Sequence, residues 1–373
     1  MKFSVNKAEL FDSLQKIIGV IPTKTTIQIL SNLLLSIEDN KLKLAATDLE
    51  ISMDTTCDVA DSENGSLTVP ARKFFEIIRE LPELPITIEV DDRNHVQVKT
   101  EKGVYKLIGE SEEEFPRIDV EEADFEFYLA SKKLDRMIEK TLFAVSTDEL
   151  RTTLMGVYLQ ILSNELRMVA TDGHRLAKIT YTGFAGNEKT GAVVLPTKAL
   201  QLVQRNLEQD ERVKISVGDN HVTFTCGDTK IYSKLIEGQF PNYDRVIPLD
   251  NELKMYVNKD LLAAAVKRVA IFANQYTHQI KFSLSPSSLL IQAEDVEIGG
   301  EAQESLPVDY TGDSFEIGYN AAYLLDILRH LEYDEILFNL KDATSAAIIT
   351  PAEQESDEDL LMLLMPIRLN DSI

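Results

Sequence analysis

Leu44-Ala-Ala-Thr-Asp48 is an apolar stretch of strand-like character that ends on an aspartate, and the chain contains this pattern three times. The counterparts are Val169-Ala-Thr-Asp172 and Ile291-Gln-Ala-Glu-Asp295, so the three aspartates are 124 and 123 residues apart. Short solenoid repeats have periods of about 20–50 residues, whereas this period has the length of a whole domain. The sequence therefore predicts one domain that is present in three copies.

Other landmarks on both sides of the aspartates keep the same period. Each copy opens on alternating apolar residues, which are Phe3/Val5, Phe127/Leu129 and Met255/Val257. Each copy later places a large apolar residue before proline, at Phe115-Pro116, Phe240-Pro241 and Met365-Pro366. We expect domains at residues 1–120, 126–245 and 250–373, each long enough to form its own core. Triplicated domains more often build a scaffold or a curved surface than a single catalytic cleft.

The composition is that of a globular protein, with 44% hydrophobic and 27% charged residues among 373. The first residues lack the apolar core of a signal peptide, and no apolar run approaches the ~18 residues that span a bilayer. Cys57 and Cys226 fit no zinc spacing, and two thiols in different copies favour a reducing cytoplasm. We expect a cytoplasmic protein without a membrane segment, metal or cofactor.

Helical and strand-like segments follow one another in the same order in each copy. Six segments have helical periodicity, namely residues 7–18, 71–80, 131–144, 197–209, 258–272 and 320–332. Short alternating runs lie between them, among them Leu33–Ile37, Ile86–Val90, Val96–Thr100, Val213–Val217 and Val222–Cys226. The pattern predicts an α+β protein in which each domain packs two helices on antiparallel sheets.

The net charge of −24 argues against nucleic acid as a partner, because phosphates repel an acidic protein. The six helical segments, however, hold 15 Lys and Arg against 10 Asp and Glu, so the acidic excess lies elsewhere. The basic residues that share one helix face are Arg72/Arg79, Lys198/Arg205 and Lys133/Arg136/Lys140. An amphipathic helix can simply present such residues to water, but their recurrence equally supports a common, mildly basic surface.

Sequence signatures of catalysis are scarce. There is no Gly-rich phosphate loop, no His/Cys metal spacing, no Gly-x-Ser-x-Gly elbow and no carboxylate cluster of a two-metal site. Asp172 and His174 could form an acid/base pair, but the equivalent Asp48 and Asp295 have no such neighbour. An aspartate that is common to three copies is more simply a turn residue.

Two acidic segments and one apolar segment lie near the ends of copies. Residues 109–124 hold eight carboxylates against Arg117 alone, and residues 351–359 hold five carboxylates and no base. The second segment predicts an exposed loop before the last apolar stretch, Leu360–Leu369. That stretch either completes a sheet of the third domain or forms part of an apolar groove for a partner, and both can hold.

A set of short motifs runs in order through almost the whole chain. It comprises Met1-Lys-Phe-Ser-Val5, Ile29-Leu-Ser-Asn-Leu-Leu-Leu35, Ala46-Thr-Asp-Leu-Glu50, Val69-Pro-Ala-Arg-Lys-Phe-Phe75, Val169-Ala-Thr-Asp-Gly-His-Arg-Leu-Ala177, Gly238-Gln-Phe-Pro-Asn-Tyr243 and Met365-Pro-Ile-Arg-Leu369. From residue 1 to 369 the set resembles the bacterial sliding clamps, the beta subunits of the DNA polymerase III holoenzyme. The resemblance implies the DNA-clamp fold, in which three similar domains form a half ring and two chains close head to tail around duplex DNA. It implies a non-catalytic processivity factor of DNA replication that acts at the replication fork.

The resemblance also implies which residues serve each surface. Sequence-independent contacts to duplex DNA would come from Lys24, Arg72, Arg79, Lys198 and Arg205. A hydrophobic groove for partner peptides would comprise Leu154, Thr171, Gly173, His174, Arg175, Leu176, Pro241, Val246, Asn320, Tyr323, Met365, Pro366, Ile367 and Arg368. The homodimer interface would lie at Lys73, Ile77, Ile78 and Leu107 on one chain and at Ile271 and Phe272 on the other.

The groove of this family binds linear motifs of the polymerase alpha subunit, the clamp loader, repair polymerases, and mismatch-repair and ligase proteins. His174 would then be a wall of the groove and not a base. Few phosphate contacts would suit sliding, since each strong contact adds a barrier to movement. Two other classes stay open, namely an enzyme that uses Asp172 and His174 and a monomeric adaptor without affinity for DNA.

The chain departs from the family pattern in four places. Thr25–Gln28 lacks the prolines often found there, and Thr152-Thr153 replaces aromatic residues of some members. Asp148 would repel phosphate at a position near the DNA. Asn370–Ile373 extends past the usual terminal Arg-Leu and would either fray or cover part of the groove.

Overall fold

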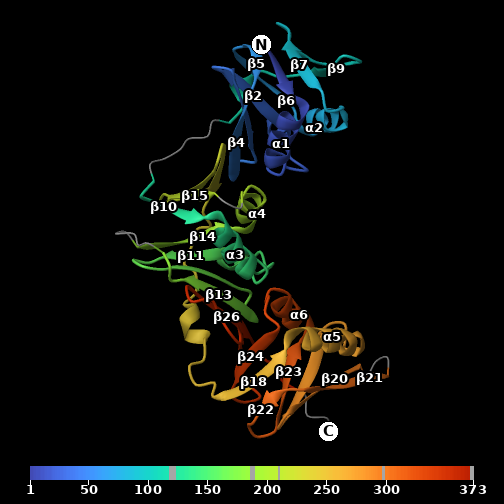
Figure 1. The fold of residues 1–373 in the computed structure, drawn as a ribbon, viewed down its shortest axis with the longest axis vertical. Helices are drawn as coiled ribbons and strands as arrows, with labels where there is room; N and C mark the ends of the chain where they lie inside the picture. The colour runs from blue at the N-terminus through green and yellow to red at the C-terminus, as the bar shows by residue number, and fades with distance from the viewer. Residues whose placement is uncertain (117–122, 185–189, 209–210, 296–298, 370–373) are drawn as a thin grey trace. The chain divides into compact units, whose positions relative to one another are not determined.

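The computed structural model describes the chain except for residues 117–122, 185–189, 209–210, 296–298 and 370–373 (Figure 1). The described residues form two compact units. Unit 1 consists of Met1–Asp135 with Lys198–Leu235, and unit 2 consists of Arg136–Thr197 with Ile236–Ile373. Arg117, the extension at 370–373 and the ends of the first and third predicted domains lie outside the described residues.

The described residues contain six α-helices, and each predicted helical segment holds one of them. They are α1 (Lys7–Ile17), α2 (Ala71–Glu80), α3 (Ser131–Leu142), α4 (Thr197–Arg205), α5 (Lys259–Val269) and α6 (Ala321–Arg329). Every predicted segment except 71–80 extends past its helix, by a single residue in the case of α1. Helix α4 stops at Arg205 because the side chain of Asn206 donates to the carbonyl of Leu202, at 2.8 Å. A short 3-10 turn, η5 (Ala270–Phe272), replaces the last predicted turn after α5.

The strands of the three copies follow one common order. The first copy contains β1 (Lys2–Asn6), β2 (Asn32–Glu38), β3 (Lys41–Thr47), β4 (Ile51–Asp58), β5 (Ala60–Glu63), β6 (Gly65–Pro70), β7 (Pro85–Val90), β8 (His95–Lys99) and β9 (Val104–Ile108). The second contains β10 (Phe125–Ala130), β11 (Gly156–Ile161), β12 (Leu166–Thr171), β13 (Arg175–Tyr181), β14 (Gly191–Pro196), β15 (Arg212–Val217), β16 (His221–Cys226) and β17 (Thr229–Lys234). The third contains β18 (Leu253–Asn258), β19 (Gln279–Ser285), β20 (Ser288–Asp295), β21 (Gly300–Pro307), β22 (Asp309–Tyr310), β23 (Phe315–Asn320), β24 (Glu335–Leu340), β25 (Ala347–Pro351) and β26 (Glu358–Leu364).

Apart from β5 and β22, each copy is a strand, a helix, four strands, a helix and three strands. This repeated order confirms the prediction of a triplicated α+β unit with two helices per copy. The predicted strand runs fall within β2, β7, β15 and β16, and the run Val96–Thr100 exceeds β8 by one residue. Leu360–Leu364 of the last apolar stretch are confirmed as part of a strand, β26, whereas Met365–Leu369 lie beyond it. Residues 352–357 form a partly exposed loop, but Glu358 and Asp359 of the predicted loop belong to β26.

Unit 1 contains a five-stranded sheet, β5-β1-β7-β8-β9, and an eight-stranded sheet, β10-β15-β16-β17-β4-β3-β2-β6. In the larger sheet β17 pairs antiparallel with β4, with Ile231 opposite Met53, so strands of two successive copies share one ladder. We call this pairing the β4–β17 joint. Helix α1 packs on α2 and on β4, and Leu10, Leu14 and Phe74 are fully buried there. The burial of these apolar side chains stabilises the helices against the sheet.

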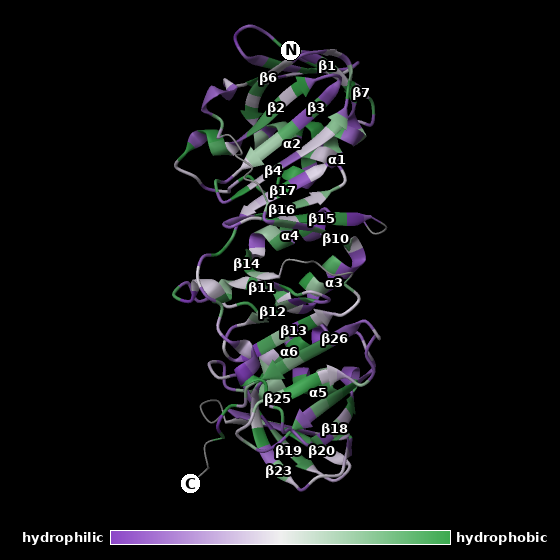
Figure 2. Ribbon diagram, turned by 90° about the vertical axis from the view of Figure 1, so that its left-hand side faces the viewer, coloured by the Kyte–Doolittle hydropathy of each residue, from purple (hydrophilic) through white to green (hydrophobic). Residues whose placement is uncertain are grey.

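Unit 2 contains a nine-stranded sheet, β14-β11-β12-β13-β26-β25-β24-β18-β22, and a four-stranded sheet, β21-β20-β19-β23. Here β13 pairs antiparallel with β26, with Leu176 opposite Leu363, and we call this pairing the β13–β26 joint. Hydrophobic residues run along β26 and α6 (Figure 2). Helices α5 and α6 pack against each other and bury Leu262 and Leu324 completely. Each unit thus holds one joint between successive copies.

Candidate functional site

Four of the five predicted DNA-contacting residues lie on or beside one loop of unit 1, Gly19–Lys24, which follows α1. Arg72 from α2 and Lys198 from α4 each donate a hydrogen bond of 3.3 Å to a backbone carbonyl of this loop. A side chain added at Gly19 would lie 3.5 Å from the guanidinium of Arg205, so Arg205 also lies beside the loop. Lys24 is exposed on the loop itself. We call Lys24, Arg72, Lys198 and Arg205 the basic cluster.

The basic cluster is partly neutralised. Lys198 forms an ion pair with Asp48, the aspartate that ends the first repeat motif. Arg79, the fifth predicted residue, lies two helical turns along α2 from Arg72, pairs with Glu80 at 2.9 Å and covers the ring of Phe75. The cluster therefore presents only a modest positive charge.

The basic side chains of α3 do not form an exposed basic face, which corrects the prediction for Arg136 and Lys140. Lys140 is fully buried and pairs with Glu332 at 2.9 Å and with Glu139 at 3.0 Å. Arg136 pairs with Glu332 and with Glu358. Burial raises the pKa of Glu332, but hydrogen bonds from Lys140 and Arg136 outweigh this and lower the pKa below its usual value. These charges stabilise unit 2 internally.

Asp48 and Asp172 make the same turn at the two joints. Each carboxylate accepts hydrogen bonds from the backbone N–H groups two and three residues later, at distances of 2.7–3.1 Å. This confirms the prediction of a turn residue for the first two copies. The residue after the aspartate has positive φ in both turns, 77° at Leu49 and 92° at Gly173. Residues 296–298 after Asp295 lie outside the described range, so the third turn is not compared.

Arg175 links β13 to α6 and to the end of α3. It is 8% exposed, and its guanidinium donates to Asp172 at 3.1 Å, to Asp326 at 2.7 Å and to the carbonyl of Phe143 at 2.9 Å. It also lies 4.8 Å from the centre of the Tyr323 ring. A buried guanidinium with several partners is a strong positional constraint, because losing one partner leaves charge unpaired. Arg175 is therefore a structural tie within the predicted groove region.

His174 lies beside Tyr323 and not against the carboxylate of Asp172. The two rings are stacked with centroids 5.9 Å apart. The carboxylate of Asp172 instead contacts the guanidinium of Arg175 and two backbone N–H groups. An acid/base pair requires the imidazole within hydrogen-bond reach of its partner, and this arrangement does not provide it. The predicted groove residues His174, Arg175 and Tyr323 therefore form one contiguous aromatic and cationic patch.

A hydrophobic cluster lies on the same part of unit 2. It contains Leu154, Val169, Leu176, Val194, Phe240, Tyr243, Ala346 and Leu363, with Tyr158, Ile236, Ile247 and Leu361 packed against it. Tyr158 and Phe240 stack face to face at 4.6 Å. Leu154 and Leu176 were predicted for this region, whereas Tyr158 and Phe240 were missed. The Phe-Pro repeat was a usable signal for Phe240, but nothing local in the sequence distinguishes Tyr158.

The residues after β26 bring further predicted groove residues to this patch. We call Met365–Leu369 the C-terminal segment. The N–H of Met365 donates to the carbonyl of His174 and the N–H of Ile367 donates to the carbonyl of Gly318, both at 2.8 Å. Asn320 begins α6 by accepting from the N–H groups of Ala322 and Tyr323, which positions the Tyr323 ring. Thr171, Gly173 and Met365 are at least partly exposed, and Val246 is half exposed.

The predicted interface residues come from a helix, a strand and a 3-10 turn. Lys73, Ile77 and Ile78 lie on α2, Leu107 lies on β9, and Ile271 and Phe272 belong to η5. A hollow of about 320 Å³ between α2 and β9 is lined by Lys73, Ile77, Leu81 and Tyr105 among others. Ile78 is fully buried inside unit 1, so it supports this surface without being part of it. Ile271 is 74% exposed and Phe272 is 37% exposed, next to β21. In the described residues, β9 and β21 are end strands of their sheets.

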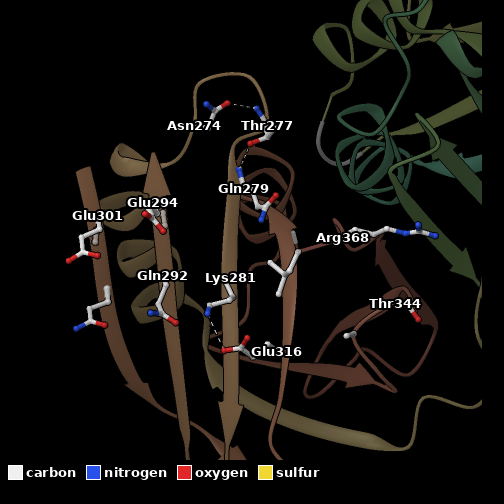
Figure 3. Close-up of a pocket in the computed structure, with 15 residues that line it drawn as sticks. Asn274, Thr277, Gln279, Lys281, Gln292, Glu294, Glu301, Glu316, Thr344 and Arg368 are labelled. Carbon is white, nitrogen blue, oxygen red and sulfur yellow. Dashed lines mark hydrogen bonds and ion pairs between the residues drawn. The ribbon is translucent and has the colours of Figure 1, made fainter. Parts of the chain in front are cut away.

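A larger, polar hollow of about 1060 Å³ lies on the face of β19, β20 and β21 (Figure 3). Gln279, Lys281, Gln292, Glu294 and Glu301 point from the strands into it, and Lys281 pairs with Glu316. The hollow also borders Arg368, so it adjoins the C-terminal segment. Its lining mixes amides with charges of both signs and has no nucleophile beside a base.

The described residues hold no group of three or more His, Cys, Asp or Glu side chains arranged around a metal position. Among the same residues, no helix combines the length and the apolar character that crossing a bilayer requires. Both cysteines are free thiols, and burial raises the pKa of Cys57 to about 11 and that of Cys226 to about 12. Protonated thiols of this kind are poor nucleophiles.

Known proteins of one family match this chain along almost its whole length. Three family models match in order, the N-terminal, central and C-terminal domains of the DNA polymerase III beta subunit, at residues 1–119, 128–242 and 244–368. The beta sliding clamp of Chlamydia muridarum is 32% identical over 371 residues and that of Pseudomonas aeruginosa 34% over 372, with 99% or more of each chain covered. The crystal structure of the Pseudomonas aeruginosa sliding clamp bound to griselimycin has a TM-score of 0.95 at 34% identity, covering 99% of this chain and 100% of that one. The Caulobacter crescentus clamp has a TM-score of 0.91 at 31% identity, with 99% and 100% covered.

Three copies of a two-helix α+β unit joined through shared sheets define a protein of the DNA-clamp class. The chain belongs to the DNA polymerase III beta subunit family, the bacterial beta sliding clamps. Its function is that of a processivity factor in DNA replication, a subunit that associates with DNA and polymerase without catalysing a reaction. The enzyme hypothesis for Asp172 and His174 is therefore wrong.

Proposed function

We propose that this clamp docks its partners on a groove of unit 2 formed by the hydrophobic cluster, the His174–Tyr323 stack and the C-terminal segment. The partners would be short linear peptides of the replicative polymerase alpha subunit, the clamp loader, repair polymerases, and mismatch-repair and ligase proteins. The observation that carries the proposal is the convergence of these elements around Arg175. Aromatic and aliphatic side chains beside polar groups of fixed position are the usual anchors for a linear motif.

We further propose that two chains close head to tail into a ring. In each unit the third strand of one copy's four-strand block pairs with the last strand of the next copy: β4 with β17, and β13 with β26. By the repeat order the next such pair would be β21 of the third copy with β9 of the first copy in a second chain. Val104 and Ile108 of β9 and Ile271 beside β21 are more than half exposed, and apolar strand edges of this kind favour a partner.

Duplex DNA would then pass along the basic cluster. We propose that Lys24, Arg72, Lys198 and Arg205 touch phosphates without reading bases, and that Arg79 adds a contact further along α2. Three modules with limits near 1–120, 126–245 and 250–373 would each contribute two helices to the DNA-facing side. The acidic remainder of the chain would repel DNA from other surfaces, and the protein would act at the replication fork.

Ring closure and encirclement can be tested together. The purified chain should sediment as a dimer and, after loading onto nicked circular DNA, should co-elute with it until the DNA is linearised. Retention on linear DNA with open ends would contradict encirclement. Ile271→Asp should give monomers, because it buries a charge against the apolar edge of β9. A monomeric wild-type chain with no salt-sensitive affinity for duplex would instead support an adaptor without DNA.

The docking proposal can be tested with a fluorescent peptide taken from the carboxyl terminus of a polymerase alpha subunit. We expect saturable binding that Met365→Asp abolishes with sedimentation unchanged, because Met365 is 39% exposed. Leu176→Asp should also abolish binding, but it buries a charge at the β13–β26 joint and therefore lowers the stability of unit 2 as well. Griselimycin, which is bound to the Pseudomonas aeruginosa and Bartonella birtlesii clamps, is a second probe, and we expect it to compete with the peptide. Peptide binding that survives both substitutions would refute the groove.

A further inference from the structure

Gly318 lies in the middle of β23 at the place where the C-terminal segment meets the four-stranded sheet. In the described residues β23 is an end strand of this sheet and pairs with β19 along one side. On its other side it makes an isolated antiparallel bridge to Ile367, whose N–H donates to the carbonyl of Gly318 at 2.8 Å. Two residues before Ile367, the N–H of Met365 donates to the carbonyl of His174. The C-terminal segment thus connects the turn at His174 with strand β23.

The space beside Gly318 is occupied by the backbone of this segment. A Cβ at position 318 would lie 2.6 Å from the carbonyl oxygen of Ile367 and 2.9 Å from the side chain of Leu369. The φ of Gly318 lies outside the left-handed region, so the strand conformation itself would accept any residue. The side chain of Leu369 can rotate away, whereas the Ile367 oxygen can move only with its segment. Close approach, and not conformational freedom, is therefore what requires glycine here.

We propose that Gly318 is a positioning residue for partner binding, and this inference rests on the proposed groove. By allowing the C-terminal segment to lie against β23, Gly318 sets the place of Met365–Arg368 relative to His174 and Tyr323. The strand that carries Gly318 ends at Asn320, which caps α6 and positions Tyr323. Strand β23 would thereby position two walls of the groove, namely the C-terminal segment and Tyr323.

Gly318→Ala tests the inference in the full chain. Ordinary contact at 3.4 Å would require the Ile367 carbonyl to move by about 0.8 Å from the 2.6 Å position. We expect the Ile367 amide to lose protection from hydrogen exchange while amides of the β19–β23 ladder keep theirs. The polymerase-tail peptide should bind about tenfold or more weakly, with the dimer and the thermal midpoint unchanged. Glu316→Ala, on the same strand, removes a carboxylate whose partners are Ser283 and Lys281 and should bind the peptide like wild type.

A double-mutant cycle separates displacement of the segment from a general loss of structure. Met365→Ala should weaken peptide binding in the wild-type background but have little further effect in the Gly318→Ala background, because the segment is already displaced. Unchanged protection of Ile367, or strictly additive effects of the two substitutions, would overturn the inference while leaving the groove intact. If the wild-type chain fails to bind the peptide, the groove itself is refuted and the inference falls with it.

Discussion

The β4–β17 joint and the β13–β26 joint have the same backbone plan but different surfaces. In both, an aspartate closes the turn before the joining strand and a residue with positive φ follows it. In unit 1 the next residue, Glu50, forms an exposed ion pair with Lys234 at 3.1 Å. In unit 2 the equivalent residue, His174, is stacked on Tyr323. The same turn thus presents a solvated salt bridge at one joint and an aromatic surface at the other.

The apolar clusters of the two units also differ, because the cluster of unit 2 is richer in aromatic side chains. The cluster of unit 1 is small and aliphatic apart from Phe115, with Ile29, Leu30 and Ala45 buried and Leu34 packed against them. Position 34 corresponds to Tyr158, so the first copy lacks the Tyr158–Phe240 stack of the second. The proposed docking surface would therefore depend on a few substitutions on a repeated frame and not on the frame itself. Copies of one domain can diverge in binding while their strands still pair alike.

The largest expected effect is on the stability of unit 2. Arg175→Ala leaves Asp172 and Asp326 without their shared cation and should destabilise unit 2 by about 3 kcal/mol. Hydrogen exchange resolved by strand should show the loss in β13 and β26 and not in β4 and β17. Lys198→Ala removes the cation that pairs with Asp48 at the other joint. Because the Lys198 side chain is 43% exposed, this substitution should lower the stability of unit 1 by less than about 1 kcal/mol. If the two substitutions lowered stability equally, the two joints would not differ in how strongly a cation stabilises them.

The second effect is on peptide affinity. Tyr323→Ala should weaken binding of the polymerase-tail peptide by about 2 kcal/mol, because it removes an aromatic anchor from the proposed docking surface. Tyr323→Phe keeps the ring against His174 and Arg175 and should bind almost as wild type. Lys234→Ala, at the other joint, should have no effect in the same fluorescence titration. A loss of binding in Lys234→Ala would place the docking surface in unit 1.

The third effect concerns the two turns. Leu49 has φ of 77°, which costs a non-glycine residue about 1–2 kcal/mol, so Leu49→Gly should stabilise unit 1 by about 1 kcal/mol. Gly173→Ala should act in the opposite direction, since its φ is 92° and the new Cβ would lie 3.1 Å from Arg151. Thermal unfolding of the two variants measures both signs. If both substitutions changed stability in the same direction, the turns would not be equivalent.

The smallest effect is the pH dependence that Glu332 contributes to the stability of unit 2. The pKa of Glu332 is lowered in the folded protein, so its contribution is present above its usual pKa of 4.5 and is lost as the pH falls through the lower, folded value. Unfolding midpoints measured downward from about pH 5 should therefore fall more steeply for wild type than for Glu332→Gln. A parallel pH dependence for the two proteins would mean that Glu332 does not carry this acid sensitivity.

Local patterns predicted the elements well where the signal lies within a few residues. The helix α2 has the predicted limits, because its apolar stripe and the Pro70 before it define both face and start. The end of α4 was not predictable, since Asn206 is bonded to Leu202 and also to the carbonyl of Lys16, 190 residues earlier. The prediction of a basic face on α3 was wrong for the same reason. The acidic partners of Arg136 and Lys140, Glu332 and Glu358, come from the far end of the chain.

By itself, the sequence determined the period of the repeat, the order of strands and helices and the aspartate turns, because each depends on spacing within one copy. Only the tertiary structure decided which charges face water, since Lys140 also pairs with Glu332 and Arg175 also pairs with Asp326, and no local pattern contains these distant partners. It likewise decided that Gly318 must be small, because the backbone that fills its space belongs to a segment about fifty residues later. Long-range contacts select among the alternatives that local periodicity leaves open.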